Sequence, residues 1–406
     1  MKDSFVTKCS VPGQSRFEMP EIRFTGQTDK VQFTGKNPLL AYLFSVLRNK
    51  PQPCPPATRQ EWQEVFSVLN SHFIMPLLYC CMRRLDSALQ PPEEMFTLLR
   101  NSFLASQSRV IQMEGQLAEI ASCFDGNDLR YIVLKGPALA RTVYPHPATR
   151  PSSDLDLLVQ PCDVRRAREL LKGLGYRCLG ERFDFARDFY NDELFIKNNR
   201  HFRQIELHWA LHRFAGIASD MPSGAFFDHA VRVDLPLSSF LSLDIIDSLI
   251  HRCISNNYDK DREMRLIWLT DIAYLCNSIT ASAQWEELRK RSVQASARLA
   301  VEFALRTADK WIGFDLPLEF ADFNTWPEPA QMEKDAWDKL RTRHNRLADM
   351  IRLHLSSGLS ISQRIRYFFH LLFPTPQSMR LSYKVSSSWQ LPAAYIRRWL
   401  KWLRGI

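Results

Sequence analysis

The segment SDLDLLV, residues 153–159, decides the fold of this chain. Polar and aliphatic residues alternate along it, and this alternation predicts a β-strand, because successive side chains of a strand point to opposite faces. Asp154 and Asp156 fall on one face, and the other face is wholly aliphatic. The segment therefore predicts a half-buried strand that presents two carboxylates on the same side.

The two carboxylates of this strand suit a metal ion. Residues two positions apart on a strand are separated by about 6.6 Å along the backbone. Two bare carboxylates at that distance repel each other, and one of them would take up a proton unless a cation lies between them. Mg²⁺ or Mn²⁺ would let Asp154 and Asp156 both stay ionised. The alternative is a pair of solvated acids on an exposed sheet face, which has the same pattern.

Basic residues precede this strand. The run LRYIVL, residues 129–134, predicts a strand that ends in a turn at Lys135 and Gly136. A glycine lets the backbone approach a phosphate closely, and a lysine supplies a cation for it. Arg150, four residues before Asp154, is able to hold the same phosphates with its two-pronged guanidinium. Each of these bases, taken alone, also fits a solvated surface charge.

A third carboxylate follows on a predicted hairpin. Residues 162–176 form an amphipathic helical pattern, and residues 193–197 and 202–211 predict two strands joined by a turn. Alternation places Glu206 opposite the buried face of the second strand, on the same side as His208. A third carboxylate is what a two-cation site for phosphoryl chemistry needs. The alternative is a solvated glutamate on a hairpin.

The regions on both sides of this core have helical periodicity. Apolar residues recur at three- and four-residue intervals over residues 38–49, 61–85 and 93–124, and again over most of the chain from residue 242 onward. The sequence thus predicts an α+β protein with a small mixed-sheet core between N-terminal and C-terminal helical domains. The expected boundaries are a loosely ordered lead-in at 1–37, a helical domain at 38–126, the core at 127–236, a helical domain at 237–375 and a basic amphipathic tail at 376–406.

Composition narrows the class of protein. The chain has 406 residues, of which 45% are hydrophobic and 24% charged, which is typical of a globular protein with a sizeable core. Its nine cysteines form no C-x-x-C pair and are odd in number, so we expect no disulfide partner and a reducing compartment. The first residues lack the apolar stretch of a secretory signal, and no apolar run is long enough to span a bilayer. These features predict a cytoplasmic protein that is soluble or lies on a membrane surface.

The net charge of +9 is concentrated at one end of the chain. No acidic residue follows Asp349. Nine basic residues do, namely Arg352, Arg364, Arg366, Arg380, Lys384, Arg397, Arg398, Lys401 and Arg404. A neutral body with a basic end favours a local anionic contact, such as lipid headgroups, an acidic partner or an RNA backbone. Residues 391–406 have an apolar stripe, and one interpretation is that they touch the inner face of a membrane peripherally. The alternative is a helix that packs on the body and points its bases to water.

Taken in order, these motifs resemble a known family. They are Leu134-Lys135-Gly136, Tyr144-Pro145, Arg150, residues 154–159, Gly175-Tyr176 and Glu206-Leu207-His208-Trp209. The sequence is similar to the nucleotidyltransferases of the DNA polymerase beta-like superfamily, and within it to a bacterial branch classified only as nucleotidyltransferases. The resemblance extends more weakly to His251, to residues 265–272, and to Pro374, Arg380 and Tyr383. Arg265, Trp268 and Asp271 would then face the active-site cleft, or would form a structural ion pair and a core tryptophan.

This resemblance implies a metal-dependent transfer of a nucleoside monophosphate from a nucleoside triphosphate (NTP) to an acceptor, with release of pyrophosphate. By similarity, Asp154 and Asp156 hold two ions of Mg²⁺ or Mn²⁺, and Glu206 holds the catalytic one. The nucleotide-binding residues implied are Lys135, Gly136, Arg150, Ser153 and His208. One departure is the turn itself, because the wider superfamily carries Gly-Ser there and this chain lacks the hydroxyl.

The identity of the acceptor stays open after this resemblance. A small molecule, a peptide and an RNA end are all compatible acceptors. The alternative function is a catalytically inactive scaffold of the same fold, whose basic tail contacts a membrane surface or RNA.

Overall fold

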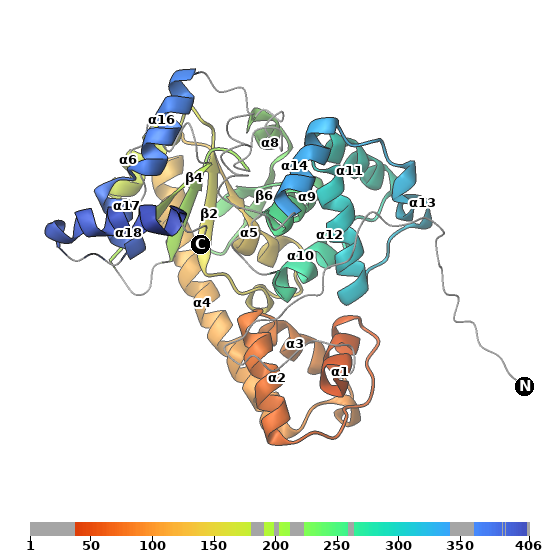
Figure 1. The fold of residues 1–406 in the computed structure, drawn as a ribbon. Coiled ribbons are helices and arrows are strands. Elements are labelled where there is room, and N and C mark those ends of the chain that lie inside the picture. The colour runs from red at the N-terminus through yellow and green to blue at the C-terminus, as the bar shows by residue number, and fades with distance from the viewer. Residues whose placement is uncertain are drawn as a thin grey trace, which may run out of the picture.

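A computed structural model describes residues 37–179, 191–198, 203–211, 223–258, 264–341, 361–383, 385 and 387–403 (Figure 1). The lead-in expected at residues 1–37 lies outside the described residues except for Asn37, which caps the first helix. Lys384 and Arg404 of the basic tail also lie outside them.

The described strands form one mixed sheet in the order β3-β4-β5-β2-β1-β7-β6. Their bounds are β1 (Tyr131–Leu134), β2 (Asp154–Val159), β3 (Arg177–Cys178), β4 (Asp192–Ile196), β5 (Gln204–His208), β6 (Val231–Asp234) and β7 (Ser239–Ser242). The pairs β2–β5 and β1–β7 are parallel, and the other neighbours are antiparallel. The predicted α+β class with a mixed-sheet core is therefore confirmed.

The strand that carries the two aspartates is more deeply buried than its sequence predicts. β2 lies between β5 and β1, and every residue from Leu155 to Val159 is buried. Helices α4 (Glu93–Asp125) and α6 (Val164–Gly173) pack on its aliphatic face, while Leu158 on the other face packs beside α8 (Ser223–His229). The strand is thus more buried than a half-buried strand, because helices cover both of its faces, and only Asp154 at its start stays half-buried.

The N-terminal helices differ from the prediction at one point. Residues 61–85 form two helices, α2 (Arg59–Ser71) and α3 (Met75–Met82), rather than one. Phe73 between them has a φ of 58°, in the left-handed region that a right-handed helix cannot contain, and the two helices are bent by 115°. Within the described residues, no single helix is long and apolar enough to cross a membrane; α2 and α3 reach that length and composition only together, across this bend.

The described residues contain further helices. They are α1 (Pro38–Leu47), α5 (Lys135–Thr142), α9 (Ile245–Tyr258), α10 (Leu266–Asn277), α11 (Ser282–Gln294), α12 (Arg298–Trp311), α13 (Leu318–Ala321), α14 (Gln331–Arg341), α16 (Ile361–Leu372), α17 (Pro376–Tyr383) and α18 (Leu391–Leu403). Figure 1 shows α4 running from the end of the molecule formed by α1–α3 to the sheet.

The N-terminal and C-terminal helices share one hydrophobic core. Tyr42 on α1, Trp62 on α2, Leu249 on α9 and Leu269 on α10 all belong to a single cluster of buried side chains. Burial of apolar surface is the main stabilising contribution to such packing. Helices that are distant in sequence therefore meet beside the sheet, and the division of the chain at residues 126, 236 and 375 stays a prediction.

Candidate active site

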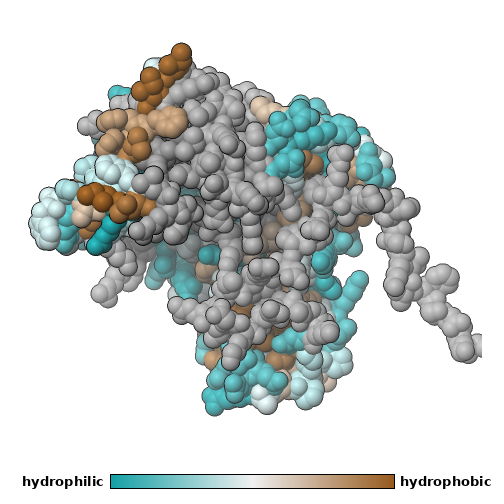
Figure 2. Space-filling model, viewed as in Figure 1, coloured by the Kyte–Doolittle hydropathy of each residue, from teal (hydrophilic) through white to brown (hydrophobic). Residues whose placement is uncertain are grey.

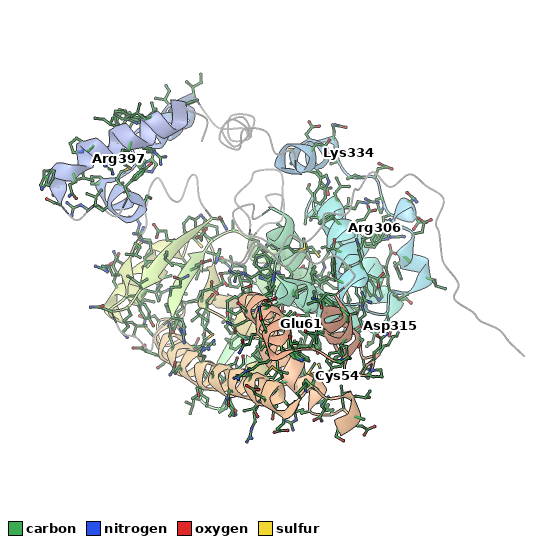
Figure 3. The ribbon with its side chains drawn as sticks, turned by 60° about the horizontal axis from the view of Figure 1, so that its bottom comes forward. Cys54, Glu61, Arg306, Asp315, Lys334 and Arg397 are labelled. Atoms are coloured by element: carbon green, nitrogen blue, oxygen red, sulfur yellow. The ribbon has the colours of Figure 1, made fainter. Side chains whose placement is uncertain are left out.

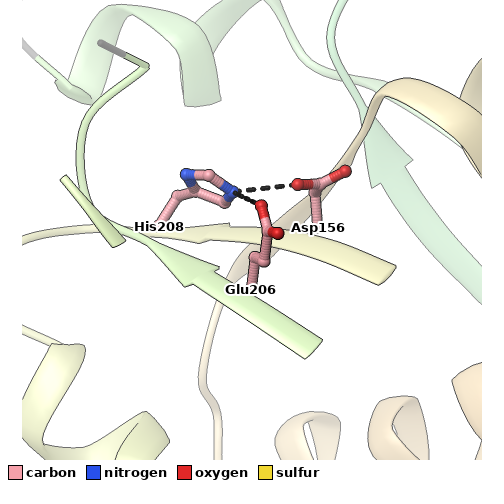
Figure 4. Close-up of side chains that lie close together, drawn as sticks. All are labelled: Asp156, Glu206 and His208. Carbon is pink, nitrogen blue, oxygen red and sulfur yellow. Dashed lines mark hydrogen bonds and ion pairs between the residues drawn. The ribbon is translucent and has the colours of Figure 1, made fainter. Parts of the chain in front are cut away.

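The parallel pairing of β2 and β5 brings two carboxylates together. In this register Asp156 lies beside Glu206, and Asp154 lies beside Gln204. His208 follows on the same face of β5, and its Nε2 lies 3.0 Å from Asp156 Oδ1 and 3.6 Å from Glu206 Oε2 (Figure 4). One donor atom from each of these three residues lies within 4.8 Å of the others. We call Asp156, Glu206 and His208 the strand group.

Lys135 reaches the strand group from the neighbouring strand. Its predecessor Leu134 pairs with Asp156 across β1 and β2, so Lys135 leaves the sheet at the level of the carboxylates. Lys135 has a φ of 52°, and its Nζ donates to Asp156 Oδ1 at 3.1 Å. Burial lowers the pKa of Lys135, but the charges of Asp156 and Glu206 outweigh burial and raise it. The lysine is therefore a fixed positive charge at the end of β1.

The strand group holds one carboxylate ionised inside the protein. Burial raises the pKa of Asp156, but Lys135 and the hydrogen bond from His208 outweigh it, and the pKa lies well below its usual range. Burial lowers the pKa of His208, whereas hydrogen bonds to Asp156 and Glu206 raise it to about 9. The hydrogen bond from His208 lowers the pKa of Glu206, but burial and the charge of Asp156 together raise it. Asp156 is thus an anion that two neighbouring cations stabilise.

A polar pocket of about 580 Å³ opens in front of β2. Its wall includes Lys135, Gly136, Arg150, Pro151, Ser152, Ser153, Asp154 and Asp156 from the core, and Phe73, Arg252, Ser255, Arg265, Ile267 and Trp268 from the helices. Asp154 is half-buried and Ser153 is exposed. Asp154 thus faces the same pocket as Asp156, although it does not belong to the strand group in this structure.

The helical wall of this pocket carries arginines stacked on aromatic rings. The guanidinium of Arg265 lies 4.9 Å from the ring centre of Phe73 and 5.7 Å from that of Trp268. The guanidinium of Arg252 lies 5.0 Å from the ring centre of Trp268, and burial lowers its pKa. Arg252 Nε is buried without a hydrogen-bond partner in the described chain. The pocket therefore has carboxylates on one wall, and a buried and a half-buried arginine on the other.

No local pattern in the sequence marks Arg252 as a site residue. It lies on α9, whose pattern of apolar residues is that of any core helix. Only the packing of α9 against the sheet brings Arg252 to the pocket, and periodicity carries no information on such long-range packing. Arg265 and Trp268 were reached through the resemblance alone.

Arg150 is engaged with an acid of the helical region. Its Nε donates to Asp271 Oδ1 at 3.0 Å, and its Nη2 donates to Asp271 Oδ2 at 2.7 Å. The hydroxyl of Tyr144 donates to Asp271 Oδ1 at 2.7 Å. Arg150 and Asp271 are both buried, so they form a structural ion pair between the core and α10. The Nε and Nη2 atoms of Arg150 are occupied by Asp271. A contact of the Arg150 guanidinium with a nucleotide stays a prediction.

Close contacts around residue 136 leave no space for a side chain larger than that of glycine. A Cβ at this position would lie 2.2 Å from Ser152 Oγ and 2.7 Å from Ser152 Cβ. Any side chain would therefore displace the loop that leads into β2, and with it the hydroxyl that donates to the Asp154 carbonyl at 3.1 Å. Gly136 also lines the pocket, which is the position that the predicted phosphate contact needs.

One family model matches the part of the chain that forms the sheet and the pocket. It is described as uncharacterised nucleotidyltransferase and matches residues 58–313. No curated protein matches the chain.

Two solved structures match the chain over about half its length. The antibiotic-resistance factor ANT(2'')-Ia matches with 15% identity over 48% of this chain and 96% of its own, at a TM-score of 0.33. An antigenic nucleotidyltransferase-like protein from Paracoccidioides brasiliensis matches with 14% identity over 47% of this chain and 90% of its own, at a TM-score of 0.29.

Proposed function

Because the chain belongs to a family of uncharacterised nucleotidyltransferases, we propose that it transfers a nucleoside monophosphate from an NTP to an acceptor. Pyrophosphate is the other product, and a divalent cation is the cofactor. The observation that carries the proposal is the pairing of Asp156 with Glu206 beside a pocket whose opposite wall is cationic. Transfer of a phosphoryl group depends mainly on positioning and on stabilisation of negative charge, and these side chains supply both.

The carboxylates fit Mg²⁺ or Mn²⁺. Asp156 and Glu206 offer adjacent oxygens on neighbouring strands, and Asp154 adds a third carboxylate on the wall of the same pocket. Oxygen ligands of this kind are those that hard divalent cations prefer. Asp156 stays ionised in spite of its burial, which is the state that a ligand needs. When bound, such a cation would neutralise the charge of the transferring phosphoryl group and polarise it.

The cations of the pocket fit a triphosphate. Lys135 and Arg265 line it, and Arg252 adds a buried charge whose Nε has no hydrogen-bond partner among the described residues. A buried unpaired donor is costly, so an anionic ligand that accepts from Arg252 would be bound with corresponding strength. We assign Ser153, which is exposed on the pocket wall, as a further contact for the nucleotide. These groups would take the place of the hydroxyl that this chain lacks at Gly136, the second residue of α5.

The proposal is tested by incubating the purified chain with Mg²⁺, a cell extract and each labelled NTP in turn. We expect a labelled product whose mass exceeds that of its acceptor by one nucleoside monophosphate, and we expect none with Asp156→Asn. A matched control is Asp244→Asn, which removes a similar acid outside the pocket. Full transfer by a folded Asp156→Asn variant would contradict the proposal.

The transfer assay gives no product either when the extract lacks the acceptor or when the protein is inactive. Calorimetric titration with the Mg²⁺ complex of each NTP distinguishes these two cases. The wild-type chain is expected to bind at least one NTP even where the extract holds no acceptor. Silent titrations with all of them would instead favour the inactive scaffold.

A further inference from the structure

The C-terminal helices leave large apolar side chains in solvent. The exposed ones on α16–α18 and the segments between them are Ile361, Ile365, Phe368, Phe369, Leu372, Phe373, Trp389, Ile396 and Leu400. Phe369 is 65% exposed and Trp389 is 77% exposed. Figure 2 shows hydrophobic residues along α16 and beside α18 on one face of the molecule. Large apolar side chains that are exposed together in one region, rather than scattered singly, mark an interaction site. We call these nine residues the apolar face.

The helices that carry this face are joined to one another. Trp399 Nε1 on α18 donates to the Leu372 carbonyl of α16 at 2.9 Å, and the Tyr395 hydroxyl donates to the Pro374 carbonyl. The rings of Phe373 and Trp399 meet edge to face, with their centres 5.4 Å apart. These contacts hold α16 beside α18. The apolar side chains that remain exposed are therefore presented by one assembled unit rather than by a single helix.

The charge of this unit has one sign. No acidic residue occurs after Asp349, while nine basic residues do. Among those whose side chains are described, Arg380 and Arg397 are exposed. Figure 3, in which Arg397 is labelled, shows the unit at the edge of the molecule. Its partner must therefore be anionic as well as apolar.

We propose that α16–α18 dock the enzyme on a membrane surface that contains anionic lipid. The apolar face enters the boundary between headgroups and acyl chains, and the arginines pair with lipid phosphates. Trp389 suits this depth, because an aromatic ring with a polar edge is favoured at the interface. The docking surface is wider than residues 391–406, since α16 and Trp389 contribute the most exposed side chains.

The exposure of the apolar stripe on α18 separates this proposal from its alternatives. If α18 covered the body of the protein, its stripe would be buried, yet Ile396 is 52% exposed and Leu400 is 46% exposed. An RNA backbone would pair with the basic side chains but would leave the apolar side chains of Phe369 and Ile365 exposed to water, which is unfavourable. A lipid surface satisfies the charge and the apolar side chains together.

The test is flotation of the full-length protein with vesicles of phosphatidylcholine alone and with vesicles that contain about 30% phosphatidylglycerol. We expect the protein to float with the anionic vesicles and to dissociate as salt rises. Phe369→Ser should weaken binding about tenfold, because one inserted ring is lost. Arg397→Glu should weaken it about fivefold or more, because each base near an anionic surface contributes about 1 kcal/mol.

The matched control substitutions lie outside α16–α18. Leu318→Ser removes an apolar side chain that is 90% exposed, and Arg109→Glu reverses an exposed charge on α4. Neither should change flotation, and circular dichroism checks that each variant is folded.

Three outcomes would overturn the proposal. One is equal binding to neutral and anionic vesicles, and another is unchanged binding by both Phe369→Ser and Arg397→Glu. The third is that the protein does not float with either kind of vesicle. It would then bind RNA instead, or form a dimer that Phe369→Ser dissociates. The proposed transferase activity is read separately, since Asp156→Asn should float like the wild-type chain.

Discussion

Two groups of acids and histidine in the described chain have donor atoms close enough to share one cation, and their surroundings differ. One is the strand group. The other, which we call the α9 group, consists of His229, Asp244 and Asp247 near the start of α9. Only the strand group has a member, Asp156, in the wall of the cationic pocket.

The α9 group is held in an ion pair with Arg291, as the strand group is with Lys135. Arg291 Nη1 on α11 donates to Asp244 Oδ2 at 2.8 Å and to Asp247 Oδ1 at 3.1 Å. Asp244 Oδ1 accepts from the backbone N–H of Asp247 at 2.7 Å, which stabilises the first turn of α9. Burial and the neighbouring Asp244 raise the pKa of Asp247, although Arg291 opposes this. The α9 group thus ties α9 to α11.

The comparison shows that closely spaced donor atoms do not by themselves indicate a catalytic site. A useful site also needs an acid that stays ionised and an open space for a substrate. Asp156 has both, because Lys135 and His208 keep it charged beside the pocket. The following predictions test this difference, beginning with the largest expected effect.

Removing one acid from each group should give opposite results. Asp156→Asn should lower nucleotidyl transfer by about 1,000-fold or more, because a ligand of the catalytic cation is lost. Asp244→Asn should leave transfer unchanged and cost about 1 kcal/mol of stability, through the lost cap and ion pair. Transfer rate and urea unfolding of both variants measure the two effects. A large loss of transfer in Asp244→Asn would remove the distinction between the groups.

The Arg150–Asp271 pair should contribute mainly to stability. Asp271→Asn leaves the Arg150 guanidinium buried without its anion, and arginine cannot relieve this by losing a proton. We expect the free energy of unfolding to fall by about 3 to 5 kcal/mol, as measured by denaturant titration. The double variant Arg150→Met with Asp271→Leu should recover only part of this loss, because Asp271 Oδ2 also lies 3.9 Å from Arg252 Nη1 and Asp271 Oδ1 accepts from the Tyr144 hydroxyl. A neutral effect of Asp271→Asn would show that the pair is not buried.

Glu333 is a buried acid. Among the described residues, no basic side chain forms a hydrogen bond with it. Its Oε1 accepts from the Leu299 N–H at 2.7 Å, and burial raises its pKa from 4.5 to about 7. The folded state therefore binds more protons than the unfolded state between these values, so stability is greatest below pH 4.5 and is lost as pH rises through 7. The free energy of unfolding that is lost over this pH range is on the order of 3 kcal/mol.

The variant Glu333→Gln keeps the acceptor for Leu299 and removes the charge. It should flatten the dependence of Tm on pH in this window, and thermal unfolding from pH 4 to pH 8 measures the change. An unchanged pH profile would contradict the assigned pKa of Glu333.

Arg252→Met tests the cationic wall. We expect the affinity for an NTP to fall about tenfold, because one charge-assisted hydrogen bond to phosphate is lost while the aliphatic packing on Trp268 is kept. The effect should appear in KM more than in kcat. Arg289→Met on α11, which does not line the pocket, serves as the matched control. Equal NTP affinity in the wild type and Arg252→Met would remove Arg252 from the nucleotide site.

Much of the site geometry follows from local patterns in the sequence. Alternation in SDLDLLV placed Asp154 and Asp156 on one face, and alternation in the later strand placed Glu206 beside His208. The structure has both strands, and it pairs Asp156 with Glu206. A period of two residues specifies which side chains share a face, so these inferences needed only a few consecutive residues.

Other features depend on contacts that no local pattern encodes. The strands β6 and β7 lie in residues that the sequence places at the end of the core and the start of a helical domain, and neither was predicted. Each has only four residues, and Leu235-Pro236 interrupts the alternation between them. The burial of β2 and the arrival of Arg252 at the pocket result from the packing of helices on both faces of the sheet.

The central claim is that the strand group, and not the α9 group, binds the catalytic cation. Binding of Mn²⁺, measured by electron paramagnetic resonance in the presence of a bound NTP, tests it most directly. We predict that the wild-type chain and Asp244→Asn immobilise Mn²⁺ alike, and that the folded Asp156→Asn/Glu206→Gln variant does not. Immobilised Mn²⁺ that survives in the Asp156→Asn/Glu206→Gln variant and disappears in Asp244→Asn would contradict the claim.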